Sequence, residues 1–163
     1  LYSNGLPFVI DEQSIVINLG ASIDSKLWNN QGYRETAKWC LSRGFKPILF
    51  GDKYCYRRAK DIQEGLNVVN TVQEGSNSFD LLNYTKLARR SRVVISPDTG
   101  ILHIADCVGK NVIGLYGPTS PSIYGPYHNM QNVVSRYGGD RNVKNISPEE
   151  VTSKLAEILK LKD

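Results

Sequence analysis

One short segment of the sequence carries residue types that suit binding of a phosphate group. Residues 20–28 (GASIDSKLW) follow an apolar run and combine small residues with hydroxyl donors, one of them Ser22, and with the positive charge of Lys26. Small residues permit close approach of the backbone, and hydroxyl and ammonium groups bind phosphate oxygens. The segment matches neither the Walker nor the GxGxxG motif. It indicates a phosphate site, and an ordinary strand-to-helix loop with a solvated lysine is the alternative.

A second segment, residues 97–103 (PDTGILH), has the composition of a helix start that could bind an anion. Asp98 could cap this helix, which would leave the amides of Thr99 and Gly100 pointing outward at its positive end. His103 lies about one turn further on, so its ring could point back toward the same bound group. The alternative is a plain helix cap and a histidine that is satisfied within the helix.

A third segment, residues 117–127 (GPTSPSIYGPY), contains three of the seven prolines and predicts a shaped loop without regular structure. Such a loop could shape a pocket or brace a domain interface, and Tyr116, Tyr124 and Tyr127 could stack on a sugar or a base. A proline-rich surface loop is the alternative. The basic clusters at 57–60 and 89–92 are interpreted as solvated faces, because no nucleic-acid recognition motif accompanies them.

Composition limits the class of protein. The chain has 163 residues, which suits one compact domain, since domains commonly have about 100–150 residues. Its 20 basic and 16 acidic residues give a net charge of +4, too small to select a partner. We find neither a signal peptide nor an apolar run of the roughly 20 residues that a membrane helix needs, and expect an intracellular protein. Three distant cysteines, Cys40, Cys55 and Cys107, predict reduced core thiols rather than a disulfide or metal site.

Short apolar runs alternate with amphipathic stretches along the chain. We expect strands at residues 14–19, 46–50, 67–72, 93–96, 112–116 and 132–135. We expect helices at residues 32–43, 54–64, 79–90 with Ser78 as its cap, 100–108, and 148–161 with a capping box at Ser147. This order predicts an α/β fold, a Rossmann-like doubly wound parallel sheet. Ligands of such sheets bind beyond the carboxyl ends of the strands, where the first two segments would form a diphosphate site.

Taken in order along the chain, these motifs resemble those of one known family. They are Gly20-Ala21-Ser22 with Lys26-x-Trp28, then Asp98-Thr99-Gly100-x-x-His103-x-Ala105 with Gly109, and then Gly117-Pro118-Thr119-x-Pro121 with Gly125-Pro126-Tyr127. The combination resembles glycosyltransferase family 9, the bacterial lipopolysaccharide heptosyltransferases, over residues 14–127. The resemblance implies one half of a GT-B fold. Residues 1–163 would form a single Rossmann-like nucleotide-sugar-binding domain, with the N-terminal GT-B domain absent from the chain.

The resemblance also implies a reaction and a set of site residues. A sugar would be transferred with inversion from a nucleoside diphosphate donor, such as ADP-heptose, to a lipid-linked saccharide of lipopolysaccharide type, without a metal or other cofactor. Lys26 and Asp98 would be catalytic, while the general base would lie in the missing domain, so the isolated chain would bind donor but turn over little or none. The donor-binding residues would be Ser22, Lys26, Asp52, Asp98, Thr99, Gly100 and His103. The setting would be the cytoplasm, with at most peripheral contact at the inner membrane face.

The chain departs from the family pattern at three places. Asp106 puts a carboxylate in a helix where small residues are usual, and Asn29 follows Trp28 where many members have proline. The acidic residue expected near the ribose is assigned to Asp52, although tyrosines occupy the same neighbourhood. Two other functions remain as alternatives: a non-catalytic nucleotide-sugar-binding module, and a sugar-nucleotide epimerase of GT-B type.

Overall fold

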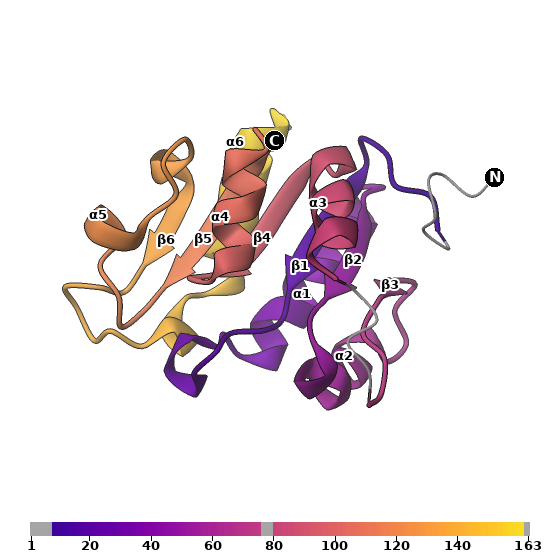
Figure 1. Cartoon of the computed structure of the whole chain (residues 1–163), viewed down its shortest axis with the longest axis horizontal. Helices are drawn as coiled ribbons and strands as arrows, with labels where there is room; N and C mark the ends of the chain where they lie inside the picture. The colour runs from indigo at the N-terminus through magenta and orange to yellow at the C-terminus, as the bar shows by residue number, and fades with distance from the viewer. Residues whose placement is uncertain (1–7, 76–79, 162–163) are drawn as a thin grey trace.

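The structure, a computed structural model, describes residues 8–75 and 80–161. Its centre is a six-stranded sheet in which every paired strand is parallel, with the order β3-β2-β1-β4-β5-β6 (Figure 1). The strands are β1 (Ser14–Asn18), β2 (Lys46–Phe50), β3 (Val69–Asn70), β4 (Val93–Pro97), β5 (Asn111–Tyr116) and β6 (Val133–Ser135). The sequence-based prediction of a doubly wound parallel α/β sheet is confirmed.

Helices cover both faces of this sheet (Figure 1). They are α1 (Asn30–Ser42), α2 (Tyr56–Gln63), α3 (Leu81–Arg90), α4 (Gly100–Cys107), α5 (Pro121–Tyr124) and α6 (Pro148–Leu159). The apolar sides of α1, α2 and α6 pack on one face, and those of α3 and α4 pack on the other. Ile15 and Ile17 of β1 belong to the first layer and Val16 to the second. A strand buried on both faces has no polar side, which is why its sequence is a continuous apolar run.

The order of the strands fixes where a ligand can approach. Successive strands run outward from β1 in one direction as far as β3, and the chain then crosses back to place β4 on the other side of β1. Helices on either side of such a reversal diverge, so a crevice opens beyond the carboxyl ends of β1 and β4. The segments that follow Asn18 and Pro97 therefore meet at this crevice.

Several predicted boundaries need correction. The expected cap Ser78 lies outside the described residues, and α3 is capped by Asp80, whose side chain accepts from the amide of Asn83 at 2.7 Å. The strand expected at 67–72 is only two residues long, and the loop at 117–127 contains one helical turn, α5, with Pro121 at its first position. The capping box of α6 is present as predicted. Within the described ranges, none of the helices is both long and apolar enough to cross a membrane.

Candidate functional site

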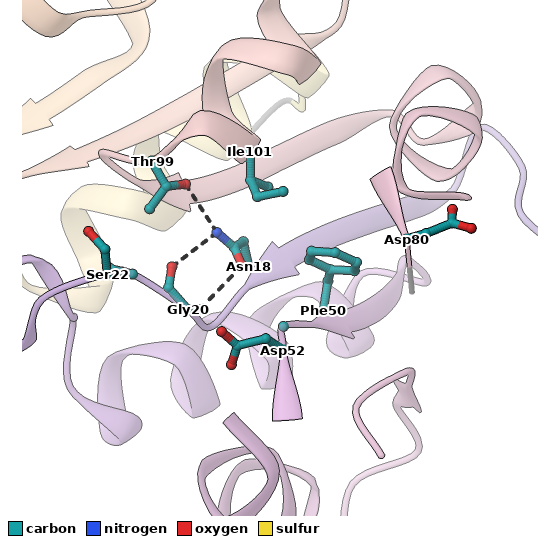
Figure 2. Close-up of a pocket in the computed structure, with 10 residues that line it drawn as sticks. Asn18, Gly20, Ser22, Phe50, Asp52, Asp80, Thr99 and Ile101 are labelled. Carbon is teal, nitrogen blue, oxygen red and sulfur yellow. Dashed lines mark hydrogen bonds between the residues drawn. The ribbon is translucent and has the colours of Figure 1, made fainter. Parts of the chain in front are cut away.

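Asn18 bridges the two sides of the crevice. Its side-chain amide Nδ2 donates to Ser96 Oγ at 2.9 Å and to Thr99 Oγ1 at 3.4 Å, so it ties the end of β1 to the end of β4. The same side chain exchanges two hydrogen bonds with the backbone of Gly20, each at 3.2 Å (Figure 2). Sequence reasoning missed Asn18. The sequence does show that Asn18 is a polar residue at the end of an apolar strand, at the expected ligand edge, and this pattern could have identified it.

A cavity of about 600 Å³ lies over this bridge. Three of the predicted site residues, Ser22, Asp52 and Thr99, line it. Figure 2 shows the ring of Phe50 and the side chain of Ile101 at the cavity, on the side away from Ser22. The cavity thus combines apolar surface at Phe50 and Ile101 with the carboxylates of Asp52 and Asp80, and such a mixture is usual in a site for a small organic ligand.

Lys26, Asp98 and Thr119 form a polar cluster next to the start of α4. Lys26 Nζ donates to Asp98 Oδ2 at 2.7 Å, and the Thr119 hydroxyl donates to the same oxygen at 2.7 Å. His103 Nε2 lies 3.8 Å from the other oxygen of Asp98. Only 8% of the Asp98 side chain is exposed, against 19% for Lys26, so this ion pair is largely withdrawn from water. The cluster joins three loops of the ligand edge through one carboxylate.

The prediction that Asp98 caps α4 is wrong. The Asp98 carboxylate is directed to Lys26 and Thr119. The N-cap of that helix is Thr99, which makes no side-chain capping hydrogen bond, and its hydroxyl contacts Asn18 and Ser96 instead. Thr99 still stands at the positive end of the helix, and Gly100 is its first residue. A Cβ atom built on Gly100 would meet no atom within 4 Å, so the backbone there is open to approach.

The predicted site residues therefore fall into two neighbouring groups. Lys26, Asp98 and His103 belong to the polar cluster, whereas Ser22 and Asp52 line the cavity. Thr99 and Gly100 connect the groups, since Thr99 lines the cavity and directly follows Asp98. The structure brings the two predicted phosphate segments to one rim of the sheet, as a shared diphosphate site requires.

The position of Arg58 differs from the interpretation of residues 57–60 as a solvated face. The neighbouring Arg57 and Lys60 are exposed, but Arg58 is half-buried, and its Nη1 donates to the carbonyl oxygens of Leu19 at 3.3 Å and Trp28 at 3.1 Å. This cluster is therefore not a uniformly solvated face. Helical spacing alone could not reveal this contact, because its acceptors are backbone atoms of another loop.

The tyrosines of the third segment have different roles. Tyr116 is fully buried and its hydroxyl donates to the carbonyl of Tyr124 at 2.7 Å, so Tyr116 cannot stack on a ligand as suggested. Burial, together with the carboxylates of Asp98 and Asp106, raises the pKa of Tyr116. Tyr124 and Tyr127 remain exposed.

The carboxylate of Asp106, which departs from the family pattern, holds the loop that follows α5 by hydrogen bonds. It is 2% exposed and accepts hydrogen bonds from Asn129 Nδ2 at 2.6 Å and from the amide of His128 at 3.1 Å. Asn129 also donates to the carbonyl of Lys110 at 2.9 Å. A buried carboxylate needs such donors, and here they hold the segment before β6 against α4.

The three cysteines differ in their exposure. Cys40 and Cys55 are buried as predicted, whereas Cys107 is exposed, contrary to the expectation of three core thiols. Desolvation, followed by the nearby Asp52 carboxylate, raises the pKa of Cys55 to about 12, so this thiol stays protonated near neutral pH. Among the residues that the structure describes, no three His, Cys, Asp or Glu side chains are grouped as metal ligands.

The fold is a Rossmann-like doubly wound sheet, and the candidate site lies at the crevice where the strand order reverses. Residues 4–152 match the family model described as glycosyltransferase family 9 (heptosyltransferase). The chain belongs to this family, and the resemblance inferred from the motifs is confirmed.

Individual relatives agree with this assignment. Lipopolysaccharide heptosyltransferase 2 of Escherichia coli is 25% identical over 156 residues, which cover 83% of this chain and 43% of the relative. Among solved structures, E. coli ADP-heptose lps heptosyltransferase II has a TM-score of 0.81 at 22% identity and covers 94% of this chain and 48% of that chain. E. coli heptosyltransferase WaaC with ADP has a TM-score of 0.78 at 23% identity, covering 94% and 46%.

A more distant similarity is to an epimerase, one of the two alternative functions considered from the sequence. UDP-GlcNAc 2-epimerase from Neisseria meningitidis has a TM-score of 0.59 at 16% identity and covers 93% of this chain and 36% of that chain, which shows a shared fold alone. The chain spans less than half the length of the curated relatives that it matches.

Proposed function

We propose that this chain is the donor-binding half of a glycosyltransferase that moves a heptose-like sugar from a nucleoside diphosphate, of the ADP-heptose class, to a saccharide of lipopolysaccharide type. Family membership supports this function. The observation that carries it is the meeting of Lys26 with Asp98, directly before the N-terminus of α4, at the rim of the cavity. A cation and a helix N-terminus at one rim suit a diphosphate.

The cavity suggests how the donor lies. Its apolar surface at Phe50 and Ile101 suits a flat base, and the exposed carboxylate of Asp52 suits the hydroxyl groups of a ribose. The diphosphate then reaches Ser22 and the backbone at Thr99, next to the polar cluster. In this arrangement the sugar lies beyond the diphosphate, toward Asp98 and His103.

The proposed reaction is a direct displacement at the anomeric carbon. A bond forms between that carbon and the acceptor oxygen, and the bond to the phosphate oxygen breaks, with its electron pair leaving on the nucleoside diphosphate. Lys26 and the positive end of α4 stabilise the negative charge that develops there. Asp98 orients Lys26 and faces the sugar, while the proton of the acceptor hydroxyl goes to a base outside this chain. Configuration at the anomeric carbon is inverted.

The remaining parts of this proposal concern partners and place. We propose that the chain forms one nucleotide-sugar-binding domain and works with an N-terminal domain of the same protein. The proposed acceptor is a lipid-linked saccharide, and the proposed setting is the cytoplasm, with at most peripheral contact at the inner membrane face. No metal, other cofactor or nucleic acid takes part.

Calorimetric titration of the chain with ADP-, UDP- and GDP-sugars tests the proposed function. We expect saturable binding of the ADP compounds and weaker binding of the others. Absence of binding to every nucleoside diphosphate would reject the proposal. Release of free sugar and nucleotide without any acceptor would instead indicate an epimerase, and donor binding by a full-length protein that never transfers sugar would indicate a non-catalytic binding module.

A further inference from the structure

Arg58 contacts both ends of the segment that carries Ser22 and Lys26. This segment, residues 19–28, is here called the phosphate loop. A single guanidinium nitrogen of Arg58, Nη1, donates to the carbonyl oxygens of Leu19 and Trp28, which are the first and last residues of the phosphate loop. One side chain on α2 thus holds together two backbone positions that are nine residues apart in the chain.

The ends of the phosphate loop are buried, whereas its middle is held by side chains of other segments, with Asn18 bonded to Gly20, Lys144 to Asp24 and Asp98 to Lys26. Leu19 and Trp28 are fully buried, and the Trp28 indole donates to the carbonyl of Ile146 at 2.9 Å. Every residue from 20 to 27 is half-buried or exposed, and the regular structure in this stretch is one short turn at 24–26. The spacing of the two ends therefore contributes, together with these contacts, to where the middle of the loop lies.

Arg58 also lies next to the candidate site. It lines a second cavity of about 390 Å³, whose wall includes Gly20, Ala21, Ser22 and Asp52. These four residues also line the larger cavity. The two cavities therefore adjoin along residues 20–22 of the phosphate loop, and Arg58 lines only the smaller one.

We propose that Arg58 is a positioning residue, which closes the phosphate loop so that Ser22 and Lys26 keep the spacing needed to bind a diphosphate. The ligand in this statement rests on the proposed function. Arg58 acts through the loop backbone and not by contact with the ligand. A guanidinium suits this task, because its planar, always charged group offers several donors in a fixed geometry, which a lysine ammonium does not.

The test compares Arg58→Met with Arg57→Met. Both variants remove one positive charge from α2, but Arg57 is exposed, so Arg57→Met is a matched control for charge and helix propensity. Hydrogen exchange of the amides at 20–27 should become about tenfold faster in Arg58→Met and stay unchanged in Arg57→Met, since a lost charged hydrogen bond is worth about a factor of ten or more. Unchanged exchange in Arg58→Met would overturn the proposal.

Binding measurements separate positioning from a general loss of stability. Well below the melting temperature, Arg58→Met should bind ADP and inorganic pyrophosphate about tenfold more weakly and bind adenosine within about twofold of the parent chain, because only phosphate contacts depend on the loop. Equal losses for ADP and adenosine would show a merely structural role and reject positioning. Arg57→Met should bind all three ligands like the parent chain.

Two further variants test the role of Arg58. If Arg58→Met does not fold, Arg58→Lys retains the charge and should show the same loss of phosphate binding in milder form; parent-like binding and exchange would reject the proposal.

The double variant Arg58→Met with Lys26→Ala should lose less ADP affinity than the sum of the two single losses, because both residues act on the same phosphate contact. If the parent chain binds neither ADP nor pyrophosphate, the proposed function fails, and loop exchange alone decides the role of Arg58.

Discussion

Substitution of the single side chain of Lys26 tests the proposed phosphate site. We predict that Lys26→Ala weakens ADP binding by about 1.5–3 kcal/mol, the usual range for a charged hydrogen bond, and leaves adenosine binding nearly unchanged. Calorimetric titration measures both affinities. Lys60→Ala, at an exposed position of α2, is the control and should bind both ligands normally. Equal loss of ADP and adenosine in Lys26→Ala would contradict the phosphate role.

Gly100 tests whether the ligand approaches the backbone at the start of α4. Gly100→Ala should fold at least as well as the parent chain, because the added methyl meets no neighbouring atom and alanine favours a helix by about 0.5–1 kcal/mol. A methyl at this amide should obstruct a phosphate, so we predict weaker ADP binding together with an unchanged or higher melting temperature. Gly139→Ala is the control, since its Cβ would meet only the Arg136 carbonyl oxygen, at 3.6 Å. Unaltered ADP affinity in Gly100→Ala would remove this amide from the site.

At the residue scale, the sequence predicted which segments meet at the ligand edge but not the contacts between them. Local composition predicts Lys26 as a phosphate ligand and Asp98 as a helix cap, and the family resemblance implies catalytic and donor-binding roles for both. Their ion pair joins residues 72 positions apart, so it depends on how β1 and β4 pair. Asn18 and Arg58 were missed for the same reason, since their partners belong to other segments of the chain.

Glu150 gives a prediction at the scale of one element, helix α6. Its carboxylate closes the capping box with Ser147 and pairs with the Arg136 guanidinium, and the hydrogen bond from Arg136 is the main reason why the pKa of Glu150 lies below the ordinary 4.5. A lowered pKa in the folded state means that this stabilisation is complete above the unfolded pKa and is lost as the pH falls through the folded pKa.

We therefore predict that Glu150→Gln lowers the free energy of unfolding by about 0.3–1 kcal/mol at pH 7, the range for an exposed ion pair, and by nothing below the folded pKa. Glutamine keeps an acceptor for the capping box, so the difference isolates the charge. Urea unfolding at pH 7, 5 and 3 measures it. Glu149→Gln, an exposed neighbour in the same helical turn, should show a smaller change. A deficit in Glu150→Gln that persists at pH 3 would rule out the ion pair as its cause.

Elements were predicted well where burial leaves a clear pattern. The central strands are buried on both faces, and their apolar runs predicted them to within one or two residues. Helix α1 begins two residues earlier than expected because Asn29 caps it by accepting from the amide of Gly32. The strand predicted at 67–72 is present only as the two-residue β3, and the turn α5 was not predicted, since tertiary contacts rather than periodicity decide the extent of such short elements.

At the scale of the whole molecule, strand order explains why two distant segments serve one site. The reversal between β1 and β4 places the phosphate loop beside the start of α4, and Asn18 bridges them. The alternation of strands and helices predicted a doubly wound sheet, and the position of the ligand edge followed from that fold class. Sequence reasoning could not give the division into a cavity and a neighbouring polar cluster, because it depends on side-chain packing across the crevice.

The length of the relatives leads to a final prediction about turnover. They are more than twice as long as the matched segment, and in this chain the carboxylate nearest the proposed sugar site, Asp98, is already engaged by Lys26 and Thr119. A positioned general base commonly contributes about 10²–10⁴-fold to a rate. We therefore predict that the 163-residue chain binds an ADP-sugar but transfers it at least about a hundredfold more slowly than a longer protein that includes the N-terminal domain.

Acceptor-dependent release of ADP measures this difference, with donor affinity determined in parallel by calorimetry. Lys26→Ala in the longer protein is the control for a defect in the donor site, since it should lower transfer by weakening both donor binding and departure of the diphosphate. If the 163-residue chain alone transfers sugar as fast as the longer protein, every group that the reaction needs lies on this chain. The acceptor base would then have to be sought among the carboxylates and histidines at the crevice, beginning with His103, whose ring is 3.8 Å from Asp98.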